Sequence, residues 1–80
     1  MMKFDLYNRV ALIEDVPENG LRRGDVVTLV DHVVAPEGTQ GYAIEIFNAV
    51  GETIALTRVP ESSLEPLRAD EVFSVRPLAA

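Results

Sequence analysis

The chain has 80 residues, of which 48% are hydrophobic, and its 13 acidic and 7 basic residues give a net charge of −6. This length suits a single domain, and no apolar run approaches the roughly 20 residues of a membrane-spanning helix. The acidic balance disfavours nucleic acid and anionic membranes and favours a basic protein partner. The absence of cysteine excludes disulfides and thiolate metal sites.

The N-terminal part of the chain predicts a first strand that begins near residue 7. Asp5 and Asn8 come too early for the apolar centre of a secretory signal, so we expect a cytoplasmic protein. Residues 7–13 suit a strand, whose successive side chains point to opposite faces, with Val10 and Leu12 on one side. Residues 16–24 then form a loop shaped by proline and glycine, whose Leu21 we expect to fold back onto the core.

Residues 25–34 form the segment richest in β-branched side chains, which favours a strand. Its apolar residues occupy both alternating sets of positions, and a bend near Asp31 and His32 explains this pattern. His32 is the only histidine of the chain. We interpret it as a solvent-facing strand residue, since no neighbouring group marks it as a catalytic base.

The second half of the chain predicts a hairpin and a short closing strand. Residues 42–47 and 53–59 each suit a strand whose side chains point alternately to its two faces, and residues 48–51 between them suit a turn. Residues 60–63 favour a single 3₁₀ turn before a last strand at residues 64–67. Because the separations are too short for crossover helices, the five strands are expected to be antiparallel. The prediction is an all-β fold, a small five-stranded SH3-like barrel over residues 1–68.

Residues 69–80 are predicted to form a C-terminal extension. Asp70 is placed to cap a short helix over residues 71–75, although the same residues also suit a strand. Val72, Phe73 and Val75 are too apolar for a free tail. We therefore expect the extension to pack on the barrel or on a partner, including a second copy of the chain in a homodimer.

The candidate binding residues gather around the first loop. Glu14, Asp15 and Glu18 place three carboxylates at its entrance. Such oxygens suit either a basic partner or, less well at this spacing, a calcium ion, and we expect neither a metal nor a cofactor. Arg22 and Arg23 form the only adjacent basic pair, for which surface salt bridges with Glu18 or Asp25 are expected. With Phe73 of the extension, these residues form the predicted partner-binding set.

Four stretches of the sequence carry a resemblance to a known family. They are Val-Ala-Leu-Ile-Glu-Asp-Val-Pro at residues 10–17, Gly-Leu-Arg-Arg-Gly-Asp-Val-Val-Thr-Leu-Val at 20–30, Gly-Glu-Thr-Ile-Ala-Leu at 51–56 and Ser-Leu-Glu-Pro-Leu at 63–67. Over roughly residues 7–67 the chain resembles a bacterial family of small proteins, the domain of unknown function 4926. The resemblance implies a barrel without a known activity, and an antitoxin or immunity-type accessory role.

The function expected from the residues is non-enzymatic. No serine lies in a nucleophile motif, and no cysteine or second histidine supports the carboxylates. We therefore predict a protein-interaction module that binds no membrane. One alternative is a nucleic-acid-associated barrel of the KOW type, which the Gly24-Asp25-Val26 start of the second strand resembles. The other is a carboxylate- or metal-dependent enzyme.

Overall fold

The computed structural model describes residues 3–78, which form five β-strands and two 3₁₀ turns. The strands are β1 (Arg9–Leu12), β2 (Val26–Val34), β3 (Gln40–Phe47), β4 (Thr53–Pro60) and β5 (Leu64–Pro66), and the turns are η1 (Pro17–Asn19) and η2 (Glu61–Ser63). Residues 3–78 contain no helix that is long and apolar enough to cross a membrane. The all-β prediction is confirmed, as is the 3₁₀ turn before the last strand.

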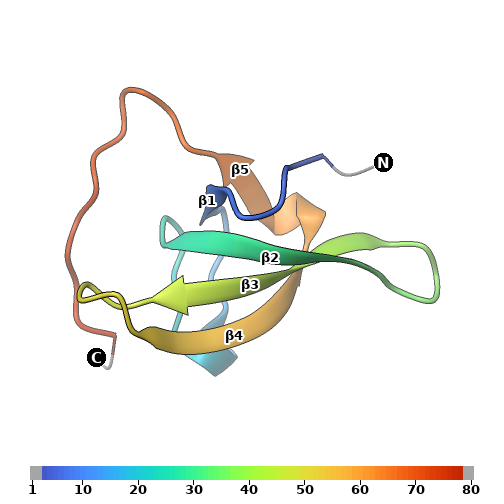
Figure 1. Ribbon diagram of the computed structural model, residues 1–80, viewed down its shortest axis with the longest axis horizontal. Helices are drawn as coiled ribbons and strands as arrows, with labels where there is room; N and C mark the ends of the chain where they lie inside the picture. Colours follow the sequence, from blue (N-terminus) through green and yellow to red (C-terminus); the bar gives the residue numbers. More distant parts are fainter. Residues whose placement is uncertain (1–2, 79–80) are drawn as a thin grey trace.

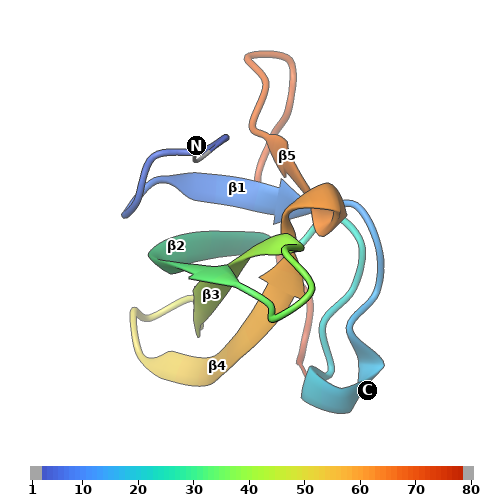
Figure 2. The same cartoon turned by 90° about the vertical axis from the view of Figure 1, so that its right-hand side faces the viewer.

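The five strands form one antiparallel sheet in the order β4-β3-β2-β1-β5. The sheet curls around the core, and the loop between β1 and β2, with η1, lies at its open side (Figures 1 and 2). Within residues 3–78 the edge strands β4 and β5 are not paired with each other. The prediction of five antiparallel strands is thus confirmed. They form an open, curled sheet instead of a closed barrel.

The core lies on the concave side of the sheet and includes part of the first loop. Leu29, Tyr42 and Ile44 are completely buried at its centre. Leu21 is 2% exposed, as the sequence predicts, and its backbone pairs with that of Val16. The first loop is therefore a packed part of the domain that closes one end of the core.

The prediction that His32 faces solvent is wrong. The register of β2 against β3 shifts between Leu29 and Asp31, so that His32 lies opposite Tyr42. This β-bulge moves His32 to the side of the strand that faces the core. The imidazole is half-buried, 5.3 Å from the ring of Tyr42. The bend that the sequence predicts near Asp31 is this bulge.

Within its described part, residues 69–78, the C-terminal extension has no regular secondary structure, so both the helix and the strand considered for residues 71–75 are wrong. One turn forms there, in which the N–H of Glu71 donates to the carbonyl of Arg68 at 3.1 Å. A helix confined between Asp70 and Pro77 is too short to be stable without a packed face. In Figure 1 the extension leaves β5, bows outward and runs past the ends of the strands toward η1.

The predicted domain boundary at residue 68 lies two residues after the end of β5. The first two residues of the predicted barrel, 1–2, and the last two of the predicted extension, 79–80, lie outside the described residues.

Candidate interaction surface

Two carboxylates organise the first loop by accepting hydrogen bonds from its backbone. Asp25 accepts from the N–H of Arg22 at 2.8 Å, and Asp15 accepts from the N–H of Arg23 at 2.9 Å. The N–H of Gly24 donates to the carbonyl of Leu12 at 2.8 Å, which ties the loop to β1. Because the acceptors are charged, these bonds are stronger than those between neutral groups. The loop therefore holds both carboxylates in fixed positions.

Arg76 anchors the extension to this loop. Its Nε lies 3.1 Å from Oδ1 of Asp25, and its Nη2 donates to Oδ2 of the same carboxylate. Nη2 also donates to the carbonyl of Gly20 at 3.2 Å. The two side chains are half-buried, with exposed fractions of 26% for Arg76 and 21% for Asp25. The hydrogen bond to Asp25 raises the pKa of Arg76, desolvation opposes it, and the charges of Asp25 and Asp15 add to the increase.

Two weaker contacts hold the rest of the extension. The guanidinium of Arg9 lies 5.3 Å from the centre of the Phe73 ring, a cation–π contact. Leu78 lies against Gly20, where its Cδ1 would be 3.7 Å from an added Cβ. Between residues 72 and 78, no backbone-to-backbone hydrogen bond forms within the part of the chain that the structure describes. Side-chain hydrogen bonds and packing contacts thus attach this stretch to the domain.

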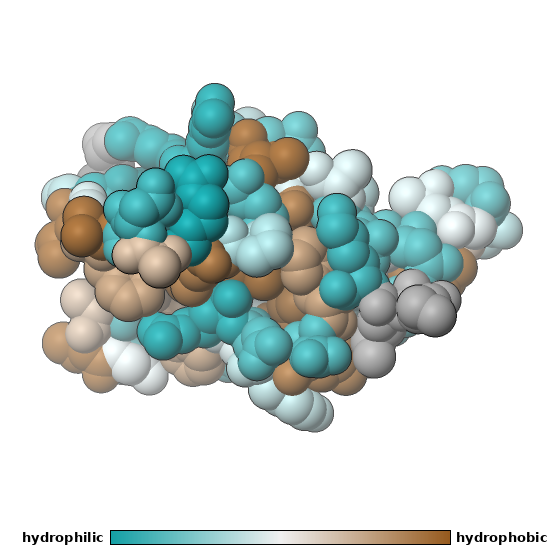
Figure 3. Space-filling model, turned by 90° about the horizontal axis from the view of Figure 1, so that it is seen from above, coloured by the Kyte–Doolittle hydropathy of each residue, from teal (hydrophilic) through white to brown (hydrophobic). Residues whose placement is uncertain are grey.

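Shallow hollows remain between the extension and the sheet. One of about 350 Å³ is lined by Ala11, Arg23, Val26 and Phe73, among others. A second of about 500 Å³ lies between the extension and the β3–β4 turn. Figure 3 shows apolar patches among polar side chains, some of them at the end of the molecule that the extension crosses in Figure 1. The extension therefore lies over the sheet without filling the hollows beneath it.

Three apolar side chains within residues 72–75 of the extension are largely exposed to solvent. The exposed fractions are 90% for Val72, 68% for Phe73 and 89% for Val75. Single exposed apolar residues are common, but three within four residues form a patch. The first loop and the extension together make up a surface that we call the loop–extension surface, residues 14–25 and 67–78.

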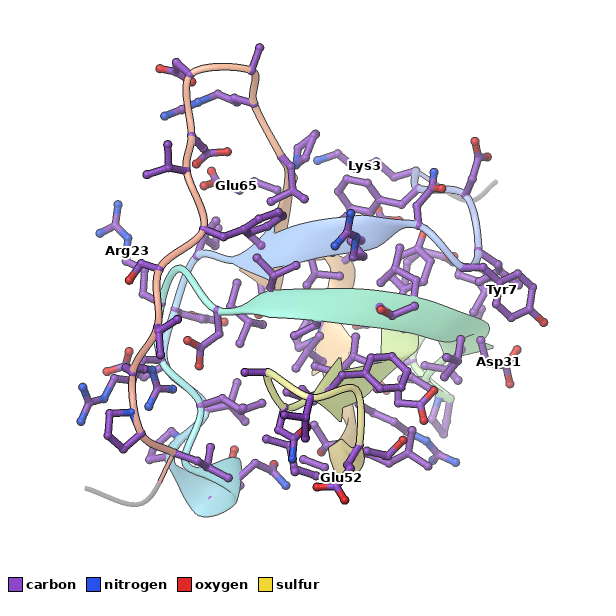
Figure 4. All side chains as sticks on the ribbon, turned by 60° about the vertical axis from the view of Figure 1, so that its left-hand side comes forward. Lys3, Tyr7, Arg23, Asp31, Glu52 and Glu65 are labelled. Atoms are coloured by element: carbon purple, nitrogen blue, oxygen red, sulfur yellow. The ribbon has the colours of Figure 1, made fainter. Side chains whose placement is uncertain are left out.

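The structure brings together only some of the predicted binding residues. Arg23 and Phe73 line one hollow, and Asp15 bonds to the backbone of Arg23. Figure 4 places Arg23 beside the extension, at the end of the molecule opposite Tyr7 and Asp31. Glu14 instead accepts a hydrogen bond from the hydroxyl of Ser63, at η2.

The other predicted residues lie on the solvent side of the first loop. Glu18 is exposed in η1, and Arg22 is exposed between Leu21 and Arg23. The expected salt bridges of Arg22 and Arg23 with Glu18 or Asp25 are wrong, because neither arginine forms an ion pair within residues 3–78. Asp25 is instead occupied by Arg76 and by the backbone of Arg22.

Sequence reasoning did not identify Arg76 as the anchor of the extension. The available signal was a single arginine between an apolar stretch and a proline, and it does not reveal a partner 51 residues away. For the calcium alternative, no three histidine, aspartate or glutamate side chains of residues 3–78 gather closely enough to hold a metal ion.

The family resemblance expected from the motifs is confirmed by comparison with known proteins. The family model of a domain of unknown function, DUF4926, matches residues 6–66, which is more than half of the chain. No curated protein and no solved structure gives a significant match. The chain therefore belongs to the DUF4926 family.

Proposed function

We propose that this protein is a non-catalytic interaction module that binds a protein partner through the loop–extension surface. The observation that carries the proposal is the exposure of Val72, Phe73 and Val75 on one short segment. Exposed apolar patches on small domains commonly mark sites of protein interaction. Burying two valines in an interface would supply roughly 3 kcal/mol of binding free energy.

The charge of the chain favours a basic partner. Glu18 and Asp15 of the first loop are exposed, and the whole chain carries a net charge of −6. Complementary charges speed association and select partners more than they strengthen the final complex. We therefore expect a partner with a basic rim around an apolar contact. A bacterial cytoplasmic setting fits a chain without cysteine.

Affinity capture with matched variants tests the proposal. Tagged wild-type protein is expected to retain one stoichiometric partner from native cells, and V72S/V75S to retain at least about tenfold less. L56S is the control, because Leu56 is 65% exposed on β4 and lines neither hollow beneath the extension. Equal capture by the three proteins, or no stoichiometric partner at all, would contradict the proposal.

A narrower form of the proposal makes the partner a toxin or effector that the domain neutralises, in keeping with the accessory role that the family resemblance implies. It predicts that co-expression restores growth of cells that produce the partner, and that V72S/V75S does not restore it. Growth arrest that persists with the wild-type protein would contradict this form.

Nucleic acid is the competing partner, since Arg22 and Arg23 are exposed and form no ion pair within residues 3–78. Retention of labelled RNA or DNA at about 50 mM salt by the wild type, and not by R22A/R23A, would replace a protein partner with a nucleic acid. We expect no retention by either protein, because the net charge is negative.

A further inference from the structure

The contact between Arg76 and Asp25 has the form of a recognition site for arginine. Two nitrogens of one guanidinium face the two oxygens of one carboxylate, and a nitrogen of that group also donates to the carbonyl of Gly20. A planar guanidinium matches such a set of acceptors, whereas the ammonium of lysine acts as a point charge and has no second nitrogen for a pair of parallel hydrogen bonds. The geometry of the site therefore selects for arginine.

The loop builds this site without help from the extension. The N–H of Arg22 holds the Asp25 carboxylate, and the N–H of Arg23 holds the neighbouring Asp15. Gly20 ends η1 with its N–H bonded to the carbonyl of Pro17 at 3.0 Å. All these contacts lie within residues 15–25. If Arg76 departed, the loop would present the same acceptors to another guanidinium.

The extension resembles a bound peptide more than a structural element. Its residues 72–78 make no backbone-to-backbone hydrogen bond to the described chain, and Val72 and Val75 point into solvent. Hollows of about 350 and 500 Å³ remain beneath it. An extended segment with better-placed apolar side chains could fill these hollows while it supplies its own arginine.

We propose that Asp25 and the carbonyl of Gly20 form an arginine-recognition site and that Arg76 occupies it as an internal ligand. An arginine in an extended segment of the protein partner displaces the Arg76 side chain, while Val72 and Val75 of the extension stay in the interface. This inference rests on the proposed function and specifies the chemistry of the partner. The negative charges of Asp25 and Asp15 complement the incoming guanidinium. A tethered ligand competes at an effective concentration in the millimolar range, so the Arg76 guanidinium lowers the apparent affinity for the partner's arginine.

A peptide supplied in trans to the full chain tests the site. The probe is a synthetic peptide with the sequence of residues 67–78, titrated into wild-type, R76A and R58A proteins and followed by the amide NMR signals of Gly20 and Asp25. R76A is expected to bind the peptide about tenfold more tightly than the wild type, because it no longer supplies the internal guanidinium. R58A removes the same charge from β4, where Arg58 is exposed and lines neither hollow beneath the extension. R58A should therefore bind the peptide as the wild type does.

A second peptide tests the preference for arginine. Replacing the arginine that corresponds to Arg76 with lysine should weaken binding to R76A about tenfold, since one charge-assisted hydrogen bond is lost. Equal binding of both peptides, or equal binding to R76A and wild type, would overturn the proposal. A wild-type dimer that R76A abolishes would also overturn the assignment, because the occupant would then be the extension of a second copy.

These results are separable from the test of the proposed function. Arginine-selective peptide binding would establish the site even if no partner is captured from cells. Conversely, a captured partner that depends on Val72 and Val75 but binds R76A and wild type equally would support the proposed function and refute the arginine site.

Discussion

The hydroxyl of Tyr42 accepts a hydrogen bond from the backbone N–H of Phe4 at 2.9 Å, although 38 residues separate the two in the sequence. The same hydroxyl lies 3.2 Å from a carboxylate oxygen of Glu61 and 3.3 Å from the carbonyl of Phe4. Tyr42 is completely buried, and the rings of Phe4 and Tyr42 meet edge to face at 5.8 Å. One phenol thus joins the N-terminal segment, β3 and η2.

We expect Tyr42→Phe to lower the free energy of unfolding by about 1–3 kcal/mol, because the buried N–H of Phe4 would lose its acceptor. Chemical denaturation measures the change. Tyr7→Phe is the control, since Tyr7 is 74% exposed, and it should leave stability unchanged. Equal stabilities of the two variants would show that the hydroxyl of Tyr42 does not hold the N-terminal segment.

The hydroxyl of Ser63 provides a second long-range tie. Ser63 is 1% exposed and donates to the carboxylate of Glu14, two residues after the end of β1. Since hydrogen bonds to charged groups contribute more than neutral ones, Ser63→Ala should lower the free energy of unfolding by about 1.5–3 kcal/mol. The neighbouring Ser62 is exposed, and Ser62→Ala should change little. A loss of the same size in both variants would contradict the assignment.

Gly41 of β3 lies against the backbone of β4, where it pairs with Pro60. A Cβ at this position would lie 2.8 Å from the carbonyl oxygen of Val59. Gly41→Ala should therefore force the strands apart, lower the free energy of unfolding by about 1–3 kcal/mol and speed amide exchange of Tyr42. Gly38→Ala adds a methyl group with no atom within 4 Å, at a φ of +96°. The backbone strain of Gly38→Ala should stay within the β2–β3 turn. The amide exchange rate of Tyr42 should therefore equal that of the wild type in Gly38→Ala but not in Gly41→Ala.

Docking of the extension should be insensitive to pH over the ordinary range. Hydrogen bonding to Asp25 raises the pKa of Arg76 above that of a free arginine. A group whose pKa is raised by folding stabilises the folded state at every pH below its unfolded value, and this contribution is lost only above it. NMR signals of residues 72–78 in the wild type should therefore not change between about pH 7 and 10.

Arg76→Lys should make the same docking sensitive to alkaline pH. A free lysine has a pKa of about 10.4, so the extension of this variant should detach as the pH rises above that value, where the wild-type arginine stays charged. Parallel pH titrations of both proteins, followed by NMR, measure the difference. Detachment of the wild-type extension over the same range would contradict the role of Arg76.

Local features of the sequence determined the strands and turns of this protein. The alternation at residues 42–47 and 53–59 leads to the β3–β4 hairpin because successive side chains of a strand point to opposite faces. Proline and two serines at residues 60–63 produce η2 through their own backbone preferences. Such preferences act between near neighbours, so the sequence alone reveals them.

Only the tertiary structure decided where His32 and Arg76 lie. A bulge of one residue, whose position depends on how β2 pairs with β3, turns His32 toward the core. Arg76 meets Asp25 because the curled sheet brings the end of the chain back to the first loop. Both outcomes depend on contacts between distant segments, which no local pattern encodes. The surface proposed to bind a partner is therefore a product of the folded chain.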